Sequence, residues 1–187
     1  MVMNLCENML GIYGYDINGG FAEYVKASKH LADLGGVIEI PERVSYKEPS
    51  LCEPLSCCLN GLERSGVSVG KPVTIIGAGP IGLMHPMLSK EVGATQIIVG
   101  DVSEPRIKMA EKMGANFVID ANAENPVAKV KKLTGGIGAD MVITAVGSPF
   151  CNRASHPNGP KRWYGKHFWW MPSRVNCHDR PKRDSLQ

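Results

Sequence analysis

The sequence contains little that would indicate a membrane protein or a disulfide-stabilised secreted protein. None of its apolar runs approaches the roughly 18 residues of a transmembrane helix, and its start has neither the basic nor the long apolar segment of a signal peptide. The six cysteines are irregularly spaced and contain no Cys-x-x-Cys pair, which argues against a disulfide framework: Cys6, Cys52, Cys57, Cys58, Cys151 and Cys177. These absences predict a globular, cytoplasmic protein with no membrane partner.

Glycine, by contrast, is abundant and organised. The β-branched run at residues 73–76 leads directly into a Gly-x-Gly-x-x-Gly motif, which predicts a buried strand that turns into a helix. The first glycine allows the turn, the second lets the backbone approach a pyrophosphate, and the third lets the helix lie close to the sheet. N–H groups at the helix start favour a bound anion. The motif therefore predicts a dinucleotide site at Gly77, Gly79, Pro80, Ile81 and Gly82.

Asp101 strengthens this interpretation, because a Gly-x-Gly-x-x-Gly motif alone is a weak signal. The apolar segment 96–99 predicts a second strand, and Asp101 follows it, 19 residues beyond Gly82, near the spacing of about 20 for a ribose-binding acid. A carboxylate accepts hydrogen bonds from ribose hydroxyls and repels a 2′-phosphate, so NAD is expected rather than NADP. Arg106 is also predicted to bind the cofactor. The alternative is a solvated Asp101 that caps the next helix.

The residues that follow continue the same alternation of strands and helices. A helix is expected from Ser103 to Gly114, a strand at 117–119, a helix from Asn125 to Thr134 and a fourth strand at 141–143. This βαβαβαβ order predicts an α/β fold with a doubly wound parallel sheet and a ligand crevice at the carboxyl ends of the strands.

Two sets of residues on the predicted helices include side chains that could be catalytic or bind a metal. Pro86 lies about two turns into the helix after the glycines and should kink and weaken it, and His85 is expected at the surface. Cys52, Cys57 and Cys58 are interpreted as small core residues rather than metal ligands, because they lie on a mainly apolar helix. No Ser-His-Asp or Cys-His arrangement is recognised.

Three segments together identify a family resemblance. Residues 19–25 read Gly-Gly-Phe-Ala-Glu-Tyr-Val, residues 53–55 read Glu-Pro-Leu, and the glycine motif follows at similar spacing. Over about residues 5–149 the chain resembles the medium-chain zinc-dependent alcohol dehydrogenases, within them the sorbitol and threonine dehydrogenase branch. The resemblance implies a partial Rossmann sheet preceded by the end of a GroES-like β domain.

The domain organisation follows from this resemblance and from composition. Residues 1–52 are expected to be the remnant of a GroES-like catalytic domain, with short strands at 19–25 and 37–41. Residues 53–150 are expected to form the first half of an NAD-binding Rossmann domain, and residues 151–187 an irregular tail.

The resemblance implies zinc as well as NAD, but few of the expected ligands are in this sequence. In the family, zinc polarises the alcohol oxygen so that hydride can pass to the nicotinamide. Only Glu53 matches a position in or beside the catalytic zinc shell, and Cys6 matches the last cysteine of the structural-zinc quartet. Glu53 could equally be an acid interacting with a helix dipole, and one thiolate cannot close a tetrahedral site. No residue is assigned as catalytic.

The last residues differ in composition from the rest. From Cys151 onward the net charge is +6, against −3 before it, all three tryptophans lie there, and four prolines interrupt any period. An irregular tail is predicted, which leaves the fourth strand as an exposed edge. A nucleic-acid arm is the alternative, because basic and aromatic residues can bind phosphates and stack on bases; it is not favoured, because the composition changes before the fold is complete.

The leading functional hypothesis is an oxidoreductase, expected to be truncated, of the zinc-dependent alcohol or polyol dehydrogenase type. It would transfer hydride from a secondary alcohol of a polyol or amino alcohol to NAD, and family members are homo-oligomers. The competing hypothesis is a non-catalytic dinucleotide-binding fragment. A nucleic-acid partner is not expected.

Zinc content tests the assignment of the metal ligands. The purified chain should hold well under one zinc and show no alcohol dehydrogenase activity, because Glu53 and Cys6 are the only ligand positions matched. Metal analysis after gel filtration gives the stoichiometry. One zinc per chain together with measurable alcohol oxidation would contradict the prediction.

Overall fold

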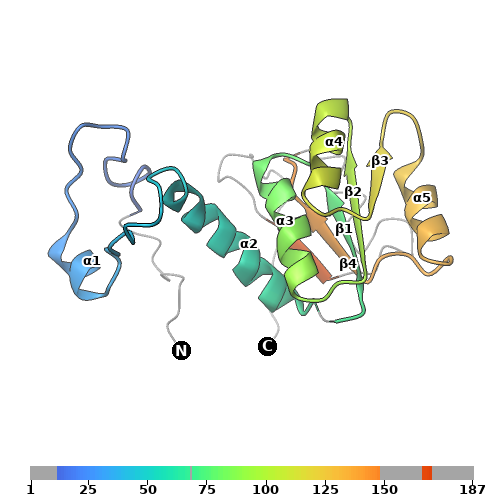
Figure 1. Ribbon diagram of the computed structural model, residues 1–187, viewed down its shortest axis with the longest axis horizontal. Coiled ribbons are helices and arrows are strands. Elements are labelled where there is room, and N and C mark those ends of the chain that lie inside the picture. The colour runs from blue at the N-terminus through green and yellow to red at the C-terminus, as the bar shows by residue number, and fades with distance from the viewer. Residues whose placement is uncertain (1–11, 68, 148–165, 170–187) are drawn as a thin grey trace, which may run out of the picture. The chain divides into compact units, whose positions relative to one another are not determined.

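The computed structural model describes residues 12–67, 69–147 and 166–169 (Figure 1). They belong to two compact units, one ending at Tyr46 and one beginning at Lys47. The predicted boundaries at residues 52 and 150 stay a prediction.

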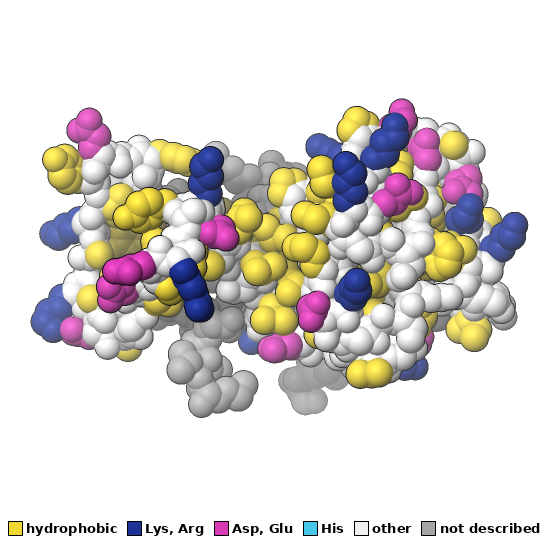
Figure 2. All heavy atoms as spheres, in the orientation of Figure 1, with side chains coloured by type: hydrophobic (Ala, Val, Ile, Leu, Met, Phe, Trp, Pro, Cys, Tyr) yellow, Lys and Arg dark blue, Asp and Glu magenta, His cyan; other side chains and the backbone are white. Residues whose placement is uncertain are grey.

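Residues 12–46 of the first unit contain one short helix, α1 (Lys29–Asp33), and the strands expected at 19–25 and 37–41 do not form. Their recorded pairing is an isolated bridge between Tyr13 and Ile17. The prediction of strands is wrong here because the described residues 12–46 include no buried side chain, so the apolar positions have no second layer to pack on. Apolar side chains therefore remain at the surface, as Figure 2 shows over this unit.

The second unit confirms the predicted parallel α/β sheet. Its strands run parallel in the order β3-β2-β1-β4-β5. Within the described residues, no helix has the length and apolar character needed to cross a membrane. Its elements are η1 (Pro49–Leu51), α2 (Cys52–Ser65), β1 (Pro72–Ile76), α3 (Pro80–Glu91), β2 (Gln96–Asp101), α4 (Glu104–Lys112), β3 (Phe117–Asp120), α5 (Pro126–Leu133), β4 (Met141–Thr144) and β5 (Lys166–Trp169).

Both faces of the sheet are covered, because alternate side chains of the strands enter two apolar cores. Val99 of β2 is buried in the larger core, with side chains of α2 and α4. Ile98, the preceding residue, is buried in the other core with Val130 of α5. This arrangement explains why the strands read as continuous apolar runs rather than as an alternating pattern.

The helix ends follow local sequence signals. Gly66 ends α2 in the left-handed conformation, with φ of 69°, and the Asn125 side chain accepts a hydrogen bond from Ala128 N–H at 3.1 Å at the start of α5. Ser103 occupies the N-cap of α4 as predicted but makes no side-chain cap bond. Its own N–H instead donates to Asp101.

The fourth strand is not the edge of the sheet. β5 pairs with β4, with Met141 opposite Lys166 and Thr144 opposite Trp169. The prediction that no regular element follows residue 150 is therefore wrong at residues 166–169. A four-residue strand is too short to show a period, and backbone hydrogen bonds to a neighbouring strand hold it without a distinctive side-chain pattern. The rest of the predicted tail lies outside the described residues.

His85 is buried, with 1% of its surface exposed, and the prediction of a surface position is wrong. Helix α3 packs against α2 as well as against β1 and β2, so it has more than one buried side. Amphipathic periodicity assumes a single buried side. The neighbouring Pro86 is also buried and does not end the helix, which continues to Glu91.

Burial makes His85 a source of pH-dependent stability. It lowers the pKa of His85 from 6.5 to about 4. Between these values the unfolded chain binds more protons than the folded chain, so the free energy of unfolding should fall as the pH drops from 6.5 to 4, by about 3 kcal/mol in full. Urea unfolding at pH 7 and pH 4.5 measures the change.

A His85→Gln variant cannot titrate and should lose this part of the pH dependence. His30→Gln, at an exposed position, serves as the matched control and should keep the parent's dependence. The same pH dependence in parent and His85→Gln would contradict the assignment.

Candidate cofactor-binding site

The glycine loop lies where the order of the strands reverses. β2 and β3 lie on one side of β1, and β4 and β5 lie on the other. The residue after β4 stays beside the end of β1, because Ala145 N–H donates to the Ile76 carbonyl at 2.8 Å. Such a switch point, at the carboxyl ends of parallel strands, is where open α/β sheets bind ligands.

Two of the three motif glycines are required by the packing of the loop. Gly77 has φ of 95°, and a Cβ there would lie 3.0 Å from the Ala145 carbonyl oxygen. A Cβ on Gly82 would overlap the Gly77 carbonyl and lie 3.3 Å from the Ala145 side chain. The close approach predicted for Gly82 therefore exists, but it is to the loop and to the residue after β4 rather than to a strand.

Gly79 differs from the other two. A Cβ there would meet no atom within 4 Å, and its φ of −71° is open to any residue. The space beside Gly79 thus borders the start of α3 and is not filled by any of the described residues. A glycine at this position keeps the backbone accessible to a ligand.

The start of α3 presents uncapped backbone donors. Gly79 is the N-cap and has no side chain to cap the helix, and Pro80 has no N–H. Leu83 N–H makes the first helical hydrogen bond, to the Gly79 carbonyl at 2.9 Å, so the N–H groups of Ile81 and Gly82 precede the helical ladder. Together with the helix dipole they favour an anion such as a pyrophosphate.

Asp101 lies beside this loop and is buried, with 8% of the residue exposed. Its Oδ2 accepts a hydrogen bond from Ala78 N–H at 2.6 Å. Its Oδ1 accepts from Val102 N–H at 2.8 Å and from Ser103 N–H at 2.9 Å. The alternative of a solvated Asp101 is therefore wrong, although the carboxylate does bind the N-cap residue of the following helix.

The structure brings together the residues predicted to bind the cofactor. Arg106, on α4, places Nη1 4.0 Å from Asp101 Oδ2, and its side chain is exposed. Sequence reasoning missed Ala78, Ala145 and Val146, which line or brace the loop. The sequence could have indicated Ala78, because it lies between two glycines of the motif. Ala145 and Val146 could have been found because they closely follow the predicted fourth strand, at the edge of the sheet where a ligand is expected.

The described residues do not form a zinc site. They contain no group of three or more His, Cys, Asp or Glu side chains that could hold a metal. Glu53 lies in the first turn of α2, where its carboxylate accepts a hydrogen bond from the Cys57 thiol at 3.1 Å. Cys6 lies outside the described residues.

The three cysteines of α2 differ in environment. Cys58 is buried, and burial is the main cause that raises its pKa to about 11. The hydrogen bond to Glu53 raises the pKa of Cys57. Cys52 is exposed, so the prediction of a core position is wrong for it, because α2 buries the side that carries Cys58 and Leu62.

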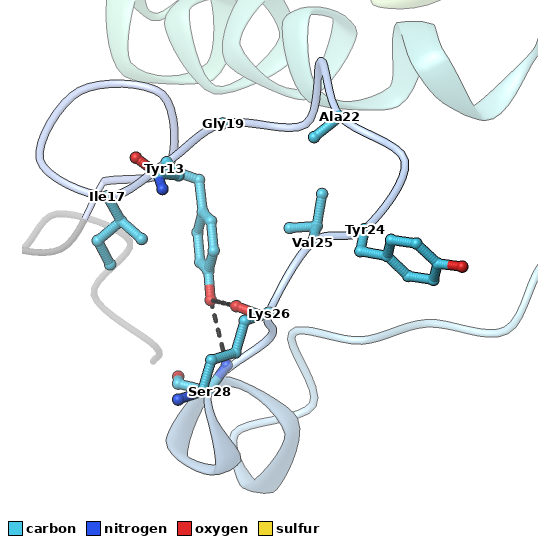
Figure 3. Close-up of a pocket in the computed structure, with 9 residues that line it drawn as sticks. Tyr13, Ile17, Gly19, Ala22, Tyr24, Val25, Lys26 and Ser28 are labelled. Atoms are coloured by element: carbon cyan, nitrogen blue, oxygen red, sulfur yellow. Dashed lines mark hydrogen bonds between the residues drawn. The ribbon is translucent and has the colours of Figure 1, made fainter.

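A cleft of about 430 Å³ lies in the first unit (Figure 3). The Tyr13 hydroxyl braces it by donating to the Lys26 carbonyl at 2.9 Å and accepting from Ser28 N–H at 3.1 Å. Among the described lining residues, Lys26 is the only charged side chain, and none is an acid, thiol or imidazole. The described lining therefore offers no zinc ligand of these three kinds, and the glycine loop is the stronger candidate for a cofactor site.

The sequence from the first residue of α3 onward matches a known family: residues 80–156 match the zinc-binding dehydrogenases. This part of the chain resembles that family. Scyllo-inosose 3-dehydrogenase from Thermotoga maritima is 39% identical over 152 residues, which are 78% of this chain and 38% of that protein. Sorbitol dehydrogenase from Ovis aries is 37% identical over 116 residues, 62% of this chain and 32% of that protein.

A solved structure gives the same assignment. A zinc-binding dehydrogenase from Sinorhizobium meliloti bound to NADP superposes with a TM-score of 0.57 at 32% identity, over 63% of this chain and 35% of that one. The resemblance to the zinc-dependent medium-chain dehydrogenases is confirmed. The chain spans less than two fifths of the length of each of these three proteins.

The requirement for glycine at residue 82 can be tested by stability. Gly82→Ala should lower the free energy of unfolding by about 1–3 kcal/mol, because its Cβ has no room beside the Gly77 carbonyl. At an unobstructed helical position the same change stabilises by about 0.5–1 kcal/mol. Urea unfolding followed by circular dichroism measures the difference.

Gly79→Ala is the matched control, three residues earlier, and should leave stability nearly unchanged because its Cβ meets open space. A Gly82→Ala variant as stable as the parent would contradict the close packing.

Proposed function

We propose that this protein binds NAD at the glycine loop and is an oxidoreductase of the zinc-dependent alcohol or polyol dehydrogenase type. The observation that carries the proposal is the open approach to Gly79, beside uncapped N–H groups of α3 and the carboxylate of Asp101. The match of residues 80–156 to the zinc-binding dehydrogenases supports the reaction class. The named relatives, which act on sorbitol and an inosose, support a polyol-type secondary alcohol as the substrate.

The residues present would hold the cofactor by its phosphates and its adenosine ribose. The N–H groups of Ile81 and Gly82 would bind the pyrophosphate, and Asp101 would accept a hydrogen bond from the ribose. Bound NAD would supply the acceptor of the hydride. Because no zinc cluster is found among the described residues, we derive no catalytic step through the metal and assign no catalytic residue.

The second candidate is a dinucleotide-binding protein without dehydrogenase activity. The observation that favours it is this absence of a metal cluster in the part of the chain that the structure describes. Cofactor binding is common to both candidates, whereas alcohol oxidation by the purified protein distinguishes them. A cytoplasmic location, a homo-oligomeric state and the absence of a nucleic-acid partner remain predictions.

Preference for NAD over NADP is part of the proposal. Asp101 places a negative charge where a 2′-phosphate would otherwise bind, and repulsion should weaken NADP. Arg106 stands nearby, and one relative was solved with NADP. Direct comparison of the two cofactors is therefore informative.

Titration of NADH by nicotinamide fluorescence tests the site. The parent should bind NADH more tightly than NADPH, and Gly79→Ala should weaken NADH by about tenfold or more, because the added methyl occupies the space that a pyrophosphate needs. The melting temperature of Gly79→Ala should stay close to the parent's.

Gly20→Ala makes the same chemical change in open space outside the loop and should leave NADH binding unchanged. Equal affinity of the parent for NADH and NADPH would refute the NAD preference. Failure of the parent to bind either cofactor would refute the proposed function.

A further inference from the structure

We propose that Asp101 is a positioning residue for the phosphate-binding loop, in addition to its expected contact with the ribose. Its carboxylate holds Ala78 N–H and so keeps the loop in the shape that receives a pyrophosphate. What the loop binds rests on the proposed function. The contact between carboxylate and loop does not, because protein atoms alone make it.

The contact is short, buried and charge-assisted. Ala78 N lies 2.6 Å from Asp101 Oδ2, the Asp101 side chain is 5% exposed, and Ala78 is 1% exposed. A hydrogen bond to a carboxylate is roughly twice as strong as a neutral one, and low local polarity strengthens it further. This bond therefore adds a polar attachment to a turn whose Ala78 side chain is already packed in the larger core.

The loop is joined to the end of β2 at two successive residues. Gly77 N–H donates to the Gly100 carbonyl at 2.8 Å, and Ala78 N–H donates to the next residue's carboxylate. The first bond continues the backbone pairing of β1 with β2, which ends at Ile76 opposite Gly100. The second bond, from Ala78 N–H, fixes the next residue of the loop to β2. Ala78 directly precedes Gly79, so this bond lies beside the open space at Gly79.

Protein N–H groups occupy most of the hydrogen-bonding positions of the Asp101 carboxylate. A carboxylate offers about four lone-pair positions, and three are taken by the N–H groups of Ala78, Val102 and Ser103. The remaining position is on Oδ2, the oxygen nearer Arg106. Asp101 can thus accept one ribose hydroxyl directly while it keeps the loop and the following turn in place.

Asparagine removes one acceptor oxygen from this side chain. With its single oxygen placed for Val102 and Ser103, its NH₂ group faces Ala78 N–H, and two donors meet. With the amide reversed, both bonds to the turn are lost. The first orientation keeps two of the three bonds and is therefore favoured, so Asp101→Asn loses the bond to Ala78 at nearly constant volume.

Asp120 offers the matched control. It lies opposite Asp101 in the register of β2 and β3, and its carboxylate accepts only the local Asn122 N–H among the bonds recorded for the described residues. Asp120→Asn therefore makes the same chemical change at the same level of the sheet without touching the loop.

Hydrogen exchange of the Ala78 amide in the protein without cofactor tests the contact directly. In the parent it should exchange as slowly as amides in the sheet, although it lies in a loop. Asp101→Asn should exchange at least tenfold faster at Ala78 with no change at Ile98, and Asp120→Asn should match the parent at both. Fast exchange at Ala78 in the parent would overturn the proposal even if Asp101→Asn did not fold.

Ligand binding tests the consequence. The two probes are NADH and an NADH analogue that lacks both hydroxyls of the adenosine ribose. A positioning role predicts that Asp101→Asn weakens both, the analogue by about tenfold, whereas weakening of NADH alone would overturn it. If the parent binds neither probe, the proposed function fails, while Ala78 exchange still decides the role of Asp101 in the loop.

Discussion

Backbone pairing of β1 on both of its sides is the constraint on which the rest of this structure depends. Because β1 lies between β2 and β4, the loop that leaves it is confined between the ends of two neighbouring strands. Gly77 N–H is bonded to the end of β2, and Ala145 N–H is bonded to the end of β1. The candidate site is thus built mainly of backbone, with one carboxylate.

Crowding between the ends of β1 and β4 distinguishes two glycines of the motif, which packing requires, from the third, which packing does not require. Gly77 and Gly82 are needed because Ala145 and the loop backbone leave no room for a Cβ. Gly79 has room for a Cβ, so packing of the described residues does not require glycine there. The proposed cofactor site would give Gly79 a role, because a pyrophosphate needs a close approach to the backbone there.

The two units differ in how well the described residues account for their stability. From Lys47 on, the sheet and its helices bury apolar side chains in two cores. In residues 12–46 no described side chain is buried, so local contacts such as the bracing of Tyr13 are what hold the chain. The described residues predicted to bind the cofactor therefore all lie in the unit that has a buried core.

Sequence by itself determined those features that depend on neighbouring residues. The turn at Gly77, the cap at Asn125 and the end of α2 at Gly66 were predictable, because each is a local backbone requirement met by one residue type. Apolar runs located β1 to β4 for the same reason, since strands buried on both faces are apolar throughout.

Only the tertiary structure decided which surfaces meet. Burial of His85 depends on a second helix packing against α3, and β5 depends on an open neighbour in β4. The strands expected at 19–25 and 37–41 required a second layer that the described residues do not supply. Spacing placed Asp101 near a ribose, but the bond from Ala78 joins residues 23 positions apart, and such a contact exists only once parallel pairing brings two strand ends together.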